Sequence, residues 1–437
     1  MKTLARVAFH GLALLLAPLP ALAWGPPHHY ISQAALELLP AWQQPLLRDQ
    51  AKPFVERYCL YPDYFFAPDA KPYIMPSPPE VKALLHLPAG LEQNKLVFDY
   101  YLPRVVELFR TGDVTNAMKN FGSLTHFLED SSCPGHMAFG ETAVPAGAPT
   151  LSQMDFIRRL MPLPDEVDNE FFHYRIDHTP MTLEQLRASV QGYRPRLLGH
   201  SVDELIFNLV EEHHQMNARS ARHLIPMLQA LGEHNTNQFV AHGLAAADNG
   251  TRLLADTLFT VLSLAQNRFA SPPVRDVSLA GYTPARGTPF AWTDPNHQGR
   301  LLRNFSGSWF PKGGETDRPG RLPLKLKLPG GEVRTFAKGF GVGWRTEYTF
   351  VLPAKLFQRF TVWAGNDAAI GGAGTNTFDV LLDGKVAAST GRLPGHEQAA
   401  QLLEVPLGSA TNLTLRVQSD GAPKHTHGVW AEPTLHR

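Results

Sequence analysis

A histidine and an aspartate four residues apart are the first candidates for chemistry in this sequence. His126 and Asp130 have this spacing, which places both side chains on one face of a helix. A Pro-Gly dipeptide at 134–135 then turns the chain, so that His136 can return to the same point. Imidazole and carboxylate are ligands that zinc prefers. The segment therefore predicts one side of a metal site.

Further metal-type donors lie on other segments of the chain. They are Trp24, His29, Asp63, His86, His173 and Asp177. His173 and Asp177 repeat the four-residue spacing, whereas His86 stands alone and has a structural role as its alternative. One zinc ion takes about four ligands, so nine candidate residues predict two or three ions. Clustered zinc ions with open positions suit the hydrolysis of a phosphate ester by a zinc-activated water.

The role of Trp24 depends on processing at the amino terminus. Lys2 and Arg6 precede an apolar run at 7–22, and Ala-Leu-Ala at 21–23 has the small-x-small pattern of signal-peptide cleavage. We expect residues 1–23 to be removed and the mature protein to be secreted or periplasmic. Cleavage before Trp24 would free an α-amine that chelates a metal together with the Trp24 carbonyl.

Helices are expected to position these donors. Apolar residues recur at helical spacing in several ranges, which are 31–39, 96–110, 114–130, 202–231 and 238–269. Leu124 and Leu128 face a core on the side of the helix opposite to the donors, and Glu129 should face away from the metals. The remaining histidines, His28 among them, are expected on the surface or behind the ligands. Tyr61, Tyr64 and Phe66 could form a substrate-binding wall beside Asp63.

The character of the sequence changes near residue 270. Of the 19 histidines, 13 lie between 24 and 270, and the following range 271–290 is rich in Pro, Gly and Thr, which favours a linker. Strands are expected beyond it, at 322–328, 359–364, 377–382 and 413–417. Asp383-Gly384 predicts a hairpin turn. These patterns predict a multidomain protein in which an all-α domain precedes an all-β sandwich.

Charge and cysteine content limit the class of protein. Lys+Arg and Asp+Glu both total 40, so the chain lacks the basic excess that is typical of proteins in stable complexes with nucleic acid. A nuclease remains possible, because metal ions could supply the positive charge at its site. No mature segment has a run of apolar residues long enough to cross a membrane. Export would permit a disulfide between Cys59 and Cys133, and two free buried thiols are the alternative.

The donors at 24–180 resemble those of the superfamily that contains zinc-dependent phospholipase C and the single-strand-specific zinc nucleases. The matching motifs are Trp-Gly-x-x-x-His, Pro-Asp, His-x3-Asp-x5-His and His-x3-Asp, which begin at residues 24, 62, 126 and 173. The resemblance implies an all-helical domain over 24–270 with three zinc ions. It assigns Trp24 and His29 to one ion, Asp63, His126 and His86 to a second, and His136, His173 and Asp177 to the third. Asp130 would bridge two ions, and Asp63 would also act as the catalytic base.

The resemblance leaves the substrate open. A phospholipid cleaved by a phospholipase C-type phosphodiesterase is the first choice, and a single-stranded nucleic acid or a nucleotide is the second. Asp177 is the nuclease-like residue of the last motif, whereas Asp-Ser-Ser-Cys-Pro-Gly-His at 130–136 resembles bacterial phospholipases. A third possibility is a non-catalytic protein that binds a glycan or a surface and carries structural zinc.

The C-terminal range 291–437 resembles the NPCBM family of carbohydrate-binding-type modules, which have a β-sandwich fold. The matching segments are 336–342, 360–367, 378–385 and 430–432. The resemblance implies a glycan partner. The alternative is a sandwich that only packs on the enzyme, with Trp363 and Trp430 in its core.

Overall fold

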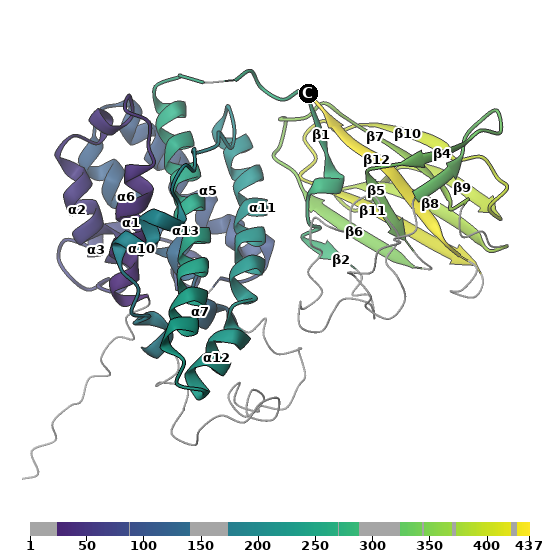
Figure 1. Cartoon of the computed structure of the whole chain (residues 1–437). Coiled ribbons are helices and arrows are strands. Elements are labelled where there is room, and N and C mark those ends of the chain that lie inside the picture. Colours follow the sequence, from purple (N-terminus) through teal and green to yellow (C-terminus); the bar gives the residue numbers. More distant parts are fainter. Residues whose placement is uncertain are drawn as a thin grey trace, which may run out of the picture.

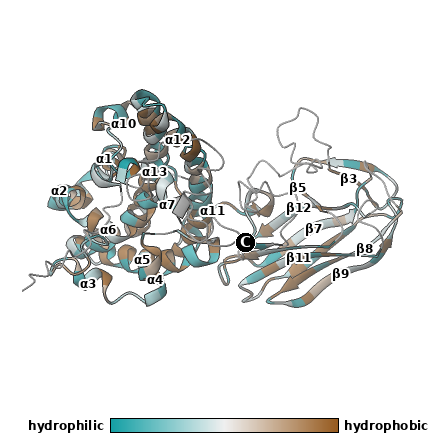
Figure 2. Cartoon of the chain, turned by 90° about the horizontal axis from the view of Figure 1, so that it is seen from below, coloured by the Kyte–Doolittle hydropathy of each residue, from teal (hydrophilic) through white to brown (hydrophobic). Residues whose placement is uncertain are grey.

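The computed structural model describes the chain in eight ranges, which are 24–86, 88–139, 174–269, 271–287, 324–342, 345–368, 373–420 and 426–437. Helices occupy the described chain up to Ala265, and strands occupy it from Asp276 onward. The two parts lie side by side, with the helices on the left and the strands on the right in Figure 1. The view from below separates the same two parts (Figure 2). The protein is therefore an all-α part followed by an all-β part, as the sequence predicts.

The α part is built from helices and short 3-10 turns. They are α1 (Gly25–Glu37), η1 (Gln44–Gln50), α2 (Ala51–Glu56), η2 (Tyr58–Leu60), α3 (Lys71–Ile74), α4 (Pro79–Leu84), α5 (Leu91–Arg110), α6 (Val114–Asp130), α7 (Pro134–Phe139), α10 (Leu183–Ser189), α11 (Val202–Ala221), α12 (Leu224–Gly232) and α13 (Thr236–Ala265).

Helix α6 is buried over most of its length. It begins at the Asp113 cap, whose carboxylate accepts a hydrogen bond from the Asn116 amide, and every residue of 120–130 is buried. Its neighbours include α1, α5, α13 and η2. The sequence predicts the bounds of α6 correctly because its apolar residues repeat at helical spacing. A helix buried on all sides must also satisfy the polar residues of its last turn.

The predicted helix at 202–231 is wrong, because the chain breaks into α11 and α12 at residues 222–223. Pro226 explains the break. It lacks the N–H group that would bond to the Arg222 carbonyl in a continuous helix, but it is tolerated in the first turn of α12. The other predicted break, near 232–235, is confirmed between α12 and α13.

The β part consists of antiparallel strands. They are β1 (Asp276–Ser278), β2 (Arg286–Gly287), β3 (Leu324–Lys327), β4 (Val333–Phe336), β5 (Gly339–Val342), β6 (Thr346–Val351), β7 (Arg359–Asn366), β8 (Thr375–Leu382), β9 (Lys385–Pro394), β10 (Gln401–Pro406), β11 (Asn412–Asp420) and β12 (Gly428–His436). One sheet has the order β1-β12-β7-β10, with β5 also on β12, and a second has the order β2-β6-β11-β8-β9. Phe360 and Trp430 of the first sheet share a buried core with Val380 and Leu415 of the second. The predicted sandwich is therefore present.

Local sequence signals are confirmed in one place and wrong in another. Asp383 and Gly384 have φ values of 46° and 80° and connect β8 to β9, as the predicted hairpin turn requires. The range 271–290 was predicted to be a linker, but β1 in this range pairs with β12 and β2 pairs with β6. Pro, Gly and Thr are typical of linkers and of short edge strands alike, so composition did not separate the two.

Helix α11 forms contacts with the β part. The Tyr282 hydroxyl donates to Asn208 Oδ1 over 2.6 Å, and the Thr283 amide donates to Glu211 Oε2 over 2.7 Å. Phe207 of α11 belongs to the core of the sandwich. The first strands of the sandwich are thus held against a helix of the α part.

Candidate metal centre

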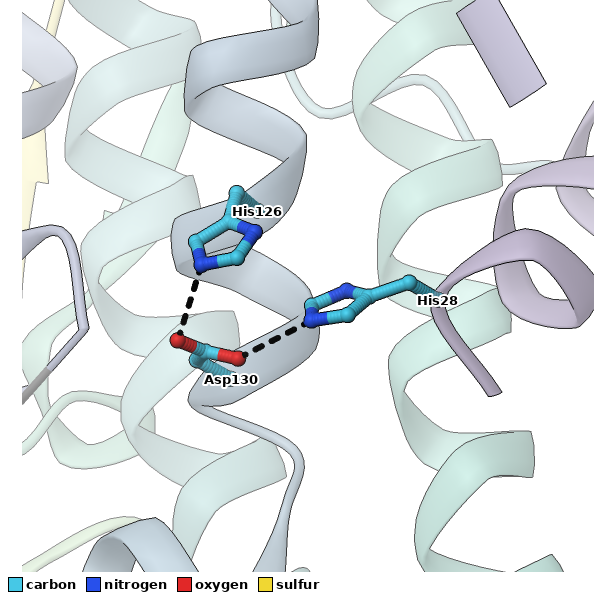
Figure 3. Close-up of side chains that lie close together, drawn as sticks. All are labelled: His28, His126 and Asp130. Atoms are coloured by element: carbon cyan, nitrogen blue, oxygen red, sulfur yellow. Dashed lines mark ion pairs between the residues drawn. The ribbon is translucent and has the colours of Figure 1, made fainter. Parts of the chain in front are cut away.

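The last turn of α6 carries His126 and Asp130, which lie side by side as their spacing predicts (Figure 3). Both side chains are fully buried. His126 Nε2 lies 3.2 Å from Asp130 Oδ2, and His126 Nδ1 bonds to the Cys59 carbonyl over 2.9 Å. A histidine whose one nitrogen is held by a carbonyl presents its other nitrogen in a fixed direction, as metal-binding histidines do.

Gly122 explains how η2 comes close enough to hold His126. A Cβ atom at residue 122 would lie 2.5 Å from the Tyr58 carbonyl oxygen, so only glycine fits against this backbone. Gly122 is one turn before His126 on α6. The close approach brings the Cys59 carbonyl to the His126 ring.

The structure corrects the histidine that was predicted for the amino-terminal motif. His28, not His29, lies in the centre: its ring is fully buried, stacks on His126 at 4.5 Å and places Nε2 3.3 Å from Asp130 Oδ1. His29 belongs to none of the ligand groups found in the described chain, and its Nδ1 bonds to the Val55 carbonyl over 2.6 Å. The missed signal was the buried face of α1. Ile31 and Ser32 are three and four residues after His28, so all three side chains lie on the same buried face of the helix. The proline pair at 26–27 starts the helix early enough to include it.

Glu129 lies behind His28. Its Oε2 is 2.6 Å from His28 Nδ1, and its Oε1 accepts a hydrogen bond from the Ser32 hydroxyl over 2.7 Å. All three side chains are fully buried. Glu129 therefore holds the nitrogen of His28 that faces away from Asp130, which leaves Nε2 directed at the Asp130 carboxylate.

Asp130 has its two oxygens directed at different histidines. Oδ1 faces His28, whereas Oδ2 lies 3.2 Å from His126 Nε2 and 3.3 Å from His86 Nδ1, as Figure 3 shows for the first two. Asp130 Oδ1 and His28 Nε2 are buried and form no hydrogen bond. A carboxylate with this arrangement can bridge two cations, because each oxygen can serve a different ion.

Asp63 and His86 complete a second group around His126. The ligand atoms of these three side chains all lie within 4.8 Å of one another. His126 Nε2 is 3.6 Å and His86 Nδ1 is 3.8 Å from Asp63 Oδ1. Both Asp63 oxygens are buried without a hydrogen-bond partner. The side chain of His86 is 38% exposed, so this group is the one that reaches the surface.

A third group contains His136 and Asp177. His136 Nδ1 bonds to the His86 carbonyl over 2.7 Å, and its Nε2 lies 3.7 Å from Asp177 Oδ1. Cys133 shares this group, with its thiol 3.5 Å from the same oxygen. His173 lies outside the described residues. The sequence brings Cys133 to this point through the turn between α6 and α7, which the predicted role of the cysteine did not anticipate.

The spacing of these atoms fits zinc. Two ligand atoms that bind a tetrahedral zinc ion at about 2.0–2.1 Å lie about 3.3 Å apart. The closest pairs of His28, His86 and His126 with Asp130 measure 3.2–3.3 Å. Buried oxygens and nitrogens that lack hydrogen bonds are costly unless another group compensates them. A divalent cation between these side chains would supply that compensation.

Electrostatic coupling in the centre is strong. Burial by itself lowers the pKa of His136, but Asp130 and Asp177 outweigh it and raise that pKa to about 9. Burial by itself raises the pKa of Asp130, but His126 and His136 outweigh it and hold that pKa well below its ordinary value. Without a cation, protonated histidines would balance the carboxylates. A metal ion would take over this role and displace the protons.

Trp24 lies at the start of the same helix. It is fully buried, caps α1 with a φ of 42°, and its carbonyl accepts a hydrogen bond from the His28 amide over 3.2 Å. The predicted amine chelate would thus form one helical turn from His28. This places the amino-terminal motif next to the buried carboxylates.

The predicted substrate wall is only partly at the surface. Tyr61 is fully buried and stacks on Tyr73 at 5.7 Å, so it does not present a surface to a substrate. Tyr64 is half-buried beneath the Arg57 guanidinium, and Phe66 is 73% exposed. The range 61–66 thus exposes its last aromatic residue and buries its first.

The predicted disulfide between Cys59 and Cys133 is not formed, since both cysteines are free and buried. Cys59 Sγ bonds to the Val55 carbonyl over 3.3 Å, whereas Cys133 Sγ faces Asp177. The alternative of two free buried thiols is the one found, and the two thiols have different partners. Burial raises the pKa of both thiols well above the ordinary value.

A cavity of about 270 Å³ lies away from the candidate metal centre, between α5, α11 and β6. None of the candidate metal ligands lines it. Within the described ranges, no helix is long and apolar enough to cross a membrane.

Comparison with known proteins identifies the C-terminal domain. Residues 305–436 match the family model described as NPCBM/NEW2 domain, so the β part carries an NPCBM domain, as the sequence resemblance implies. No curated protein matches the sequence of the chain.

Solved structures overlap both parts of the chain. The CBM51-2 and INT domains of Clostridium perfringens ZmpB share 20% identity, with coverage of 37% of this chain and 32% of that chain and a TM-score of 0.28. This chain thus spans about a third of that relative. The CBM51 of Clostridium perfringens GH95, in complex with methyl-galactose, shares 19% identity over 37% of this chain and 99% of that chain, with a TM-score of 0.29. The alpha toxin from Clostridium absonum shares 9% identity over 95% of this chain and 94% of that chain, with a TM-score of 0.34. Overlaps of this quality do not establish a common activity.

Proposed function

We propose that the chain is an exported zinc-dependent phosphoric ester hydrolase of the phospholipase C type. The observation that carries the proposal is the convergence of three groups of ligand side chains, all buried except His86, from segments far apart in the sequence. The motif resemblance to the zinc phospholipase C and nuclease superfamily supports it, because six residues of those motifs belong to the groups, together with His28 in place of His29. The six are Asp63, His86, His126, Asp130, His136 and Asp177.

The ligand sets are proposed from the geometry together with the motif resemblance. His126 occurs in two of the groups, and one nitrogen cannot serve two ions, so His126 Nε2 is assigned to the ion of Asp63 and His86, as the resemblance implies. His28 and one oxygen of Asp130 then belong to a second ion, together with the amine and carbonyl of Trp24 after cleavage. His136 and Asp177 belong to a third ion, and His173 is proposed there from its motif alone.

The chemistry requires few residues of the chain itself. Zinc, when bound, lowers the pKa of water and stabilises the negative charge that develops on phosphate oxygens. Asp63 has two buried oxygens without hydrogen bonds beside the half-exposed His86, so it can accept a proton from the attacking water and orient it. Tyr64 and Phe66, which follow Asp63 in the chain, would contact the apolar part of a substrate.

The NPCBM domain is proposed to bind a glycan and so hold the enzyme near its substrate. Its role is separate from hydrolysis, since the ligand groups all come from the α part.

The test uses the mature protein that begins at Trp24. After dialysis, elemental analysis should give about two to three zinc ions per chain. Vesicles of phosphatidylcholine should release a water-soluble phosphorylated head group, a chelator should abolish the release, and zinc should restore it. Asp63→Asn should remove activity. Asp69→Asn is the matched control, because Asp69 is in the same segment but exposed and paired with Arg57.

Other outcomes would change the assignment. Cleavage of single-stranded DNA without cleavage of lipid would make the protein a nuclease. Zinc binding without hydrolysis of any phosphate ester would favour a binding protein with structural zinc. Absence of zinc would overturn the metal centre itself.

A further inference from the structure

Cys133 lies in the turn between α6 and α7, next to two candidate zinc ligands. Its side chain, like those of His136 and Asp177, is almost completely buried. The thiol sulfur, an imidazole nitrogen of His136 and a carboxylate oxygen of Asp177 all lie within 4.8 Å of one another. The cysteine is therefore one member of a cluster that joins two distant segments of the chain.

The local backbone explains the juxtaposition. The Cys133 amide bonds to the Asp130 carbonyl over 3.0 Å, which closes a turn after α6, and Pro134 then begins α7. Cys133 and His136 are three residues apart, the spacing of neighbouring side chains on one helical face. The segment that carries Asp177 packs directly on this turn, since a Cβ at residue 135 would lie in ordinary contact, 3.4 Å from Ile176, the neighbour of Asp177.

The distances fit a zinc ion that binds sulfur. With Zn–S near 2.3 Å and Zn–O near 2.0 Å, a tetrahedral ion holds sulfur and oxygen about 3.5 Å apart. Cys133 Sγ and Asp177 Oδ1 are 3.5 Å apart, and His136 Nε2 and Asp177 Oδ1 are 3.7 Å apart. The same distance also suits a thiol that donates a hydrogen bond to the carboxylate, so the experiment must separate the two arrangements.

Cys59 provides the contrast inside the same centre. It is equally buried, but its thiol donates to the Val55 carbonyl, and it contributes its backbone oxygen to His126. The thiol of Cys59 belongs to none of the ligand groups found in the described chain, whereas the thiol of Cys133 does. Burial alone therefore does not distinguish the two cysteines, but their partners do.

We infer that Cys133 is a thiolate ligand of the third metal ion, where it joins His136 and Asp177. The inference rests on the proposed function, because it places this ion in the same centre. Binding replaces the thiol proton, which passes to the solvent, by a sulfur–metal bond. A soft sulfur ligand favours zinc over harder cations at this position, in contrast to the nitrogen and oxygen donors around Asp130.

Cobalt(II) substitution of the mature, reduced protein tests this assignment. Cobalt bound to a thiolate gives a near-ultraviolet charge-transfer band, whereas cobalt bound only to nitrogen and oxygen does not. Wild-type protein should show the band, and Cys59→Ser should retain it. Cys133→Ser should lose it and bind one ion at least about tenfold more weakly, since even the partners of ligands contribute 10–100-fold. Serine keeps a hydrogen-bond donor toward Asp177, so a purely structural thiol would tolerate the change.

The outcomes separate this inference from the proposed function. Cobalt that binds in stoichiometric amount and restores hydrolysis, but gives no thiolate band in the wild-type protein, would overturn the cysteine ligand and leave the hydrolase intact. A band that persists in Cys133→Ser and disappears in Cys59→Ser would show that Cys59 supplies the thiolate ligand, which would overturn the inference for Cys133. No binding of cobalt or zinc would overturn both proposals. Because the first readout needs only wild-type protein, poor folding of a variant does not remove the test.

Discussion

Two fully buried aspartates of the α part have opposite surroundings. Asp256 of α13 accepts hydrogen bonds on both oxygens, from the Tyr193 hydroxyl at 2.8 and 2.9 Å, from the Arg196 amide at 2.7 Å and from the Arg196 guanidinium at 2.8 and 2.9 Å. Within the described part of the chain, the side-chain partners of Asp130 of α6 are histidine nitrogens, and one of its oxygens forms no hydrogen bond.

The difference separates a structural carboxylate from a candidate ligand. Around Asp256 the protein supplies the donors and the positive charge itself, so the network is complete. Around Asp130 the neighbours are groups that bind cations as readily as they donate protons. Both side chains are fully buried carboxylates, and only their partners show which aspartate is arranged for a metal ion.

The largest effect is expected from Asp130→Asn. An amide in place of a bridging carboxylate should remove both bound metal and hydrolysis. The loss in metal affinity and activity should exceed the roughly 10–100-fold loss that follows removal of a residue behind a ligand. Elemental analysis and the head-group assay would measure both. Wild-type activity in this variant would end the assignment of a bridging role.

Asp256→Ala should act on stability alone. The Tyr193 hydroxyl and the Arg196 amide would lose a buried acceptor, which should lower the free energy of unfolding by about 2–4 kcal/mol. Chemical denaturation of the zinc-loaded protein measures the loss. Zinc content should stay unchanged at temperatures where the variant is folded, and a parallel loss of zinc would break the distinction between the two aspartates.

The loss of zinc affinity in Glu129→Gln should be smaller than the loss for a ligand and larger than the loss for a purely structural residue. Glutamine can still accept from His28 Nδ1, but the negative charge that makes the imidazole a better ligand is lost. Zinc affinity, measured by competition with a chromophoric chelator, should fall about 10–100-fold. Ser32→Ala removes the other partner of Glu129 and should have a smaller effect. Equal affinities in wild type and Glu129→Gln would show that Glu129 only fills space.

The smallest effect is expected from Asp69→Ala. Asp69 forms two hydrogen bonds with Arg57 at 2.9 Å, much as Asp256 does with Arg196, but at the surface. Exposed pairs contribute about 0–1 kcal/mol and are screened by salt. Arg57 lowers the pKa of Asp69, so the small contribution is present above the ordinary carboxyl pKa and is lost as pH falls through the lowered value. Denaturation at low and high salt would reveal it, and a salt-independent loss above 2 kcal/mol would contradict this view.

Secondary structure was predicted well where one local rule dominates. Helix α6 and the hairpin at Asp383-Gly384 follow from apolar spacing and from turn residues with positive φ. The break before Pro226 was missed although proline marks it. Strands β1 and β2 were missed because a short strand is stabilised by its partner in the sheet, not by its own sequence.

The candidate site shows the same division. The sequence by itself determined that His126, Asp130 and His136 face one point, because helical spacing and a Pro-Gly turn are local properties. Only the tertiary structure decided that His28 rather than His29 reaches Asp130, and that Cys133 faces Asp177 rather than Cys59. Adjacent residues on a helix point in directions about 100° apart, so one-residue choices of this kind depend on which face the rest of the fold buries.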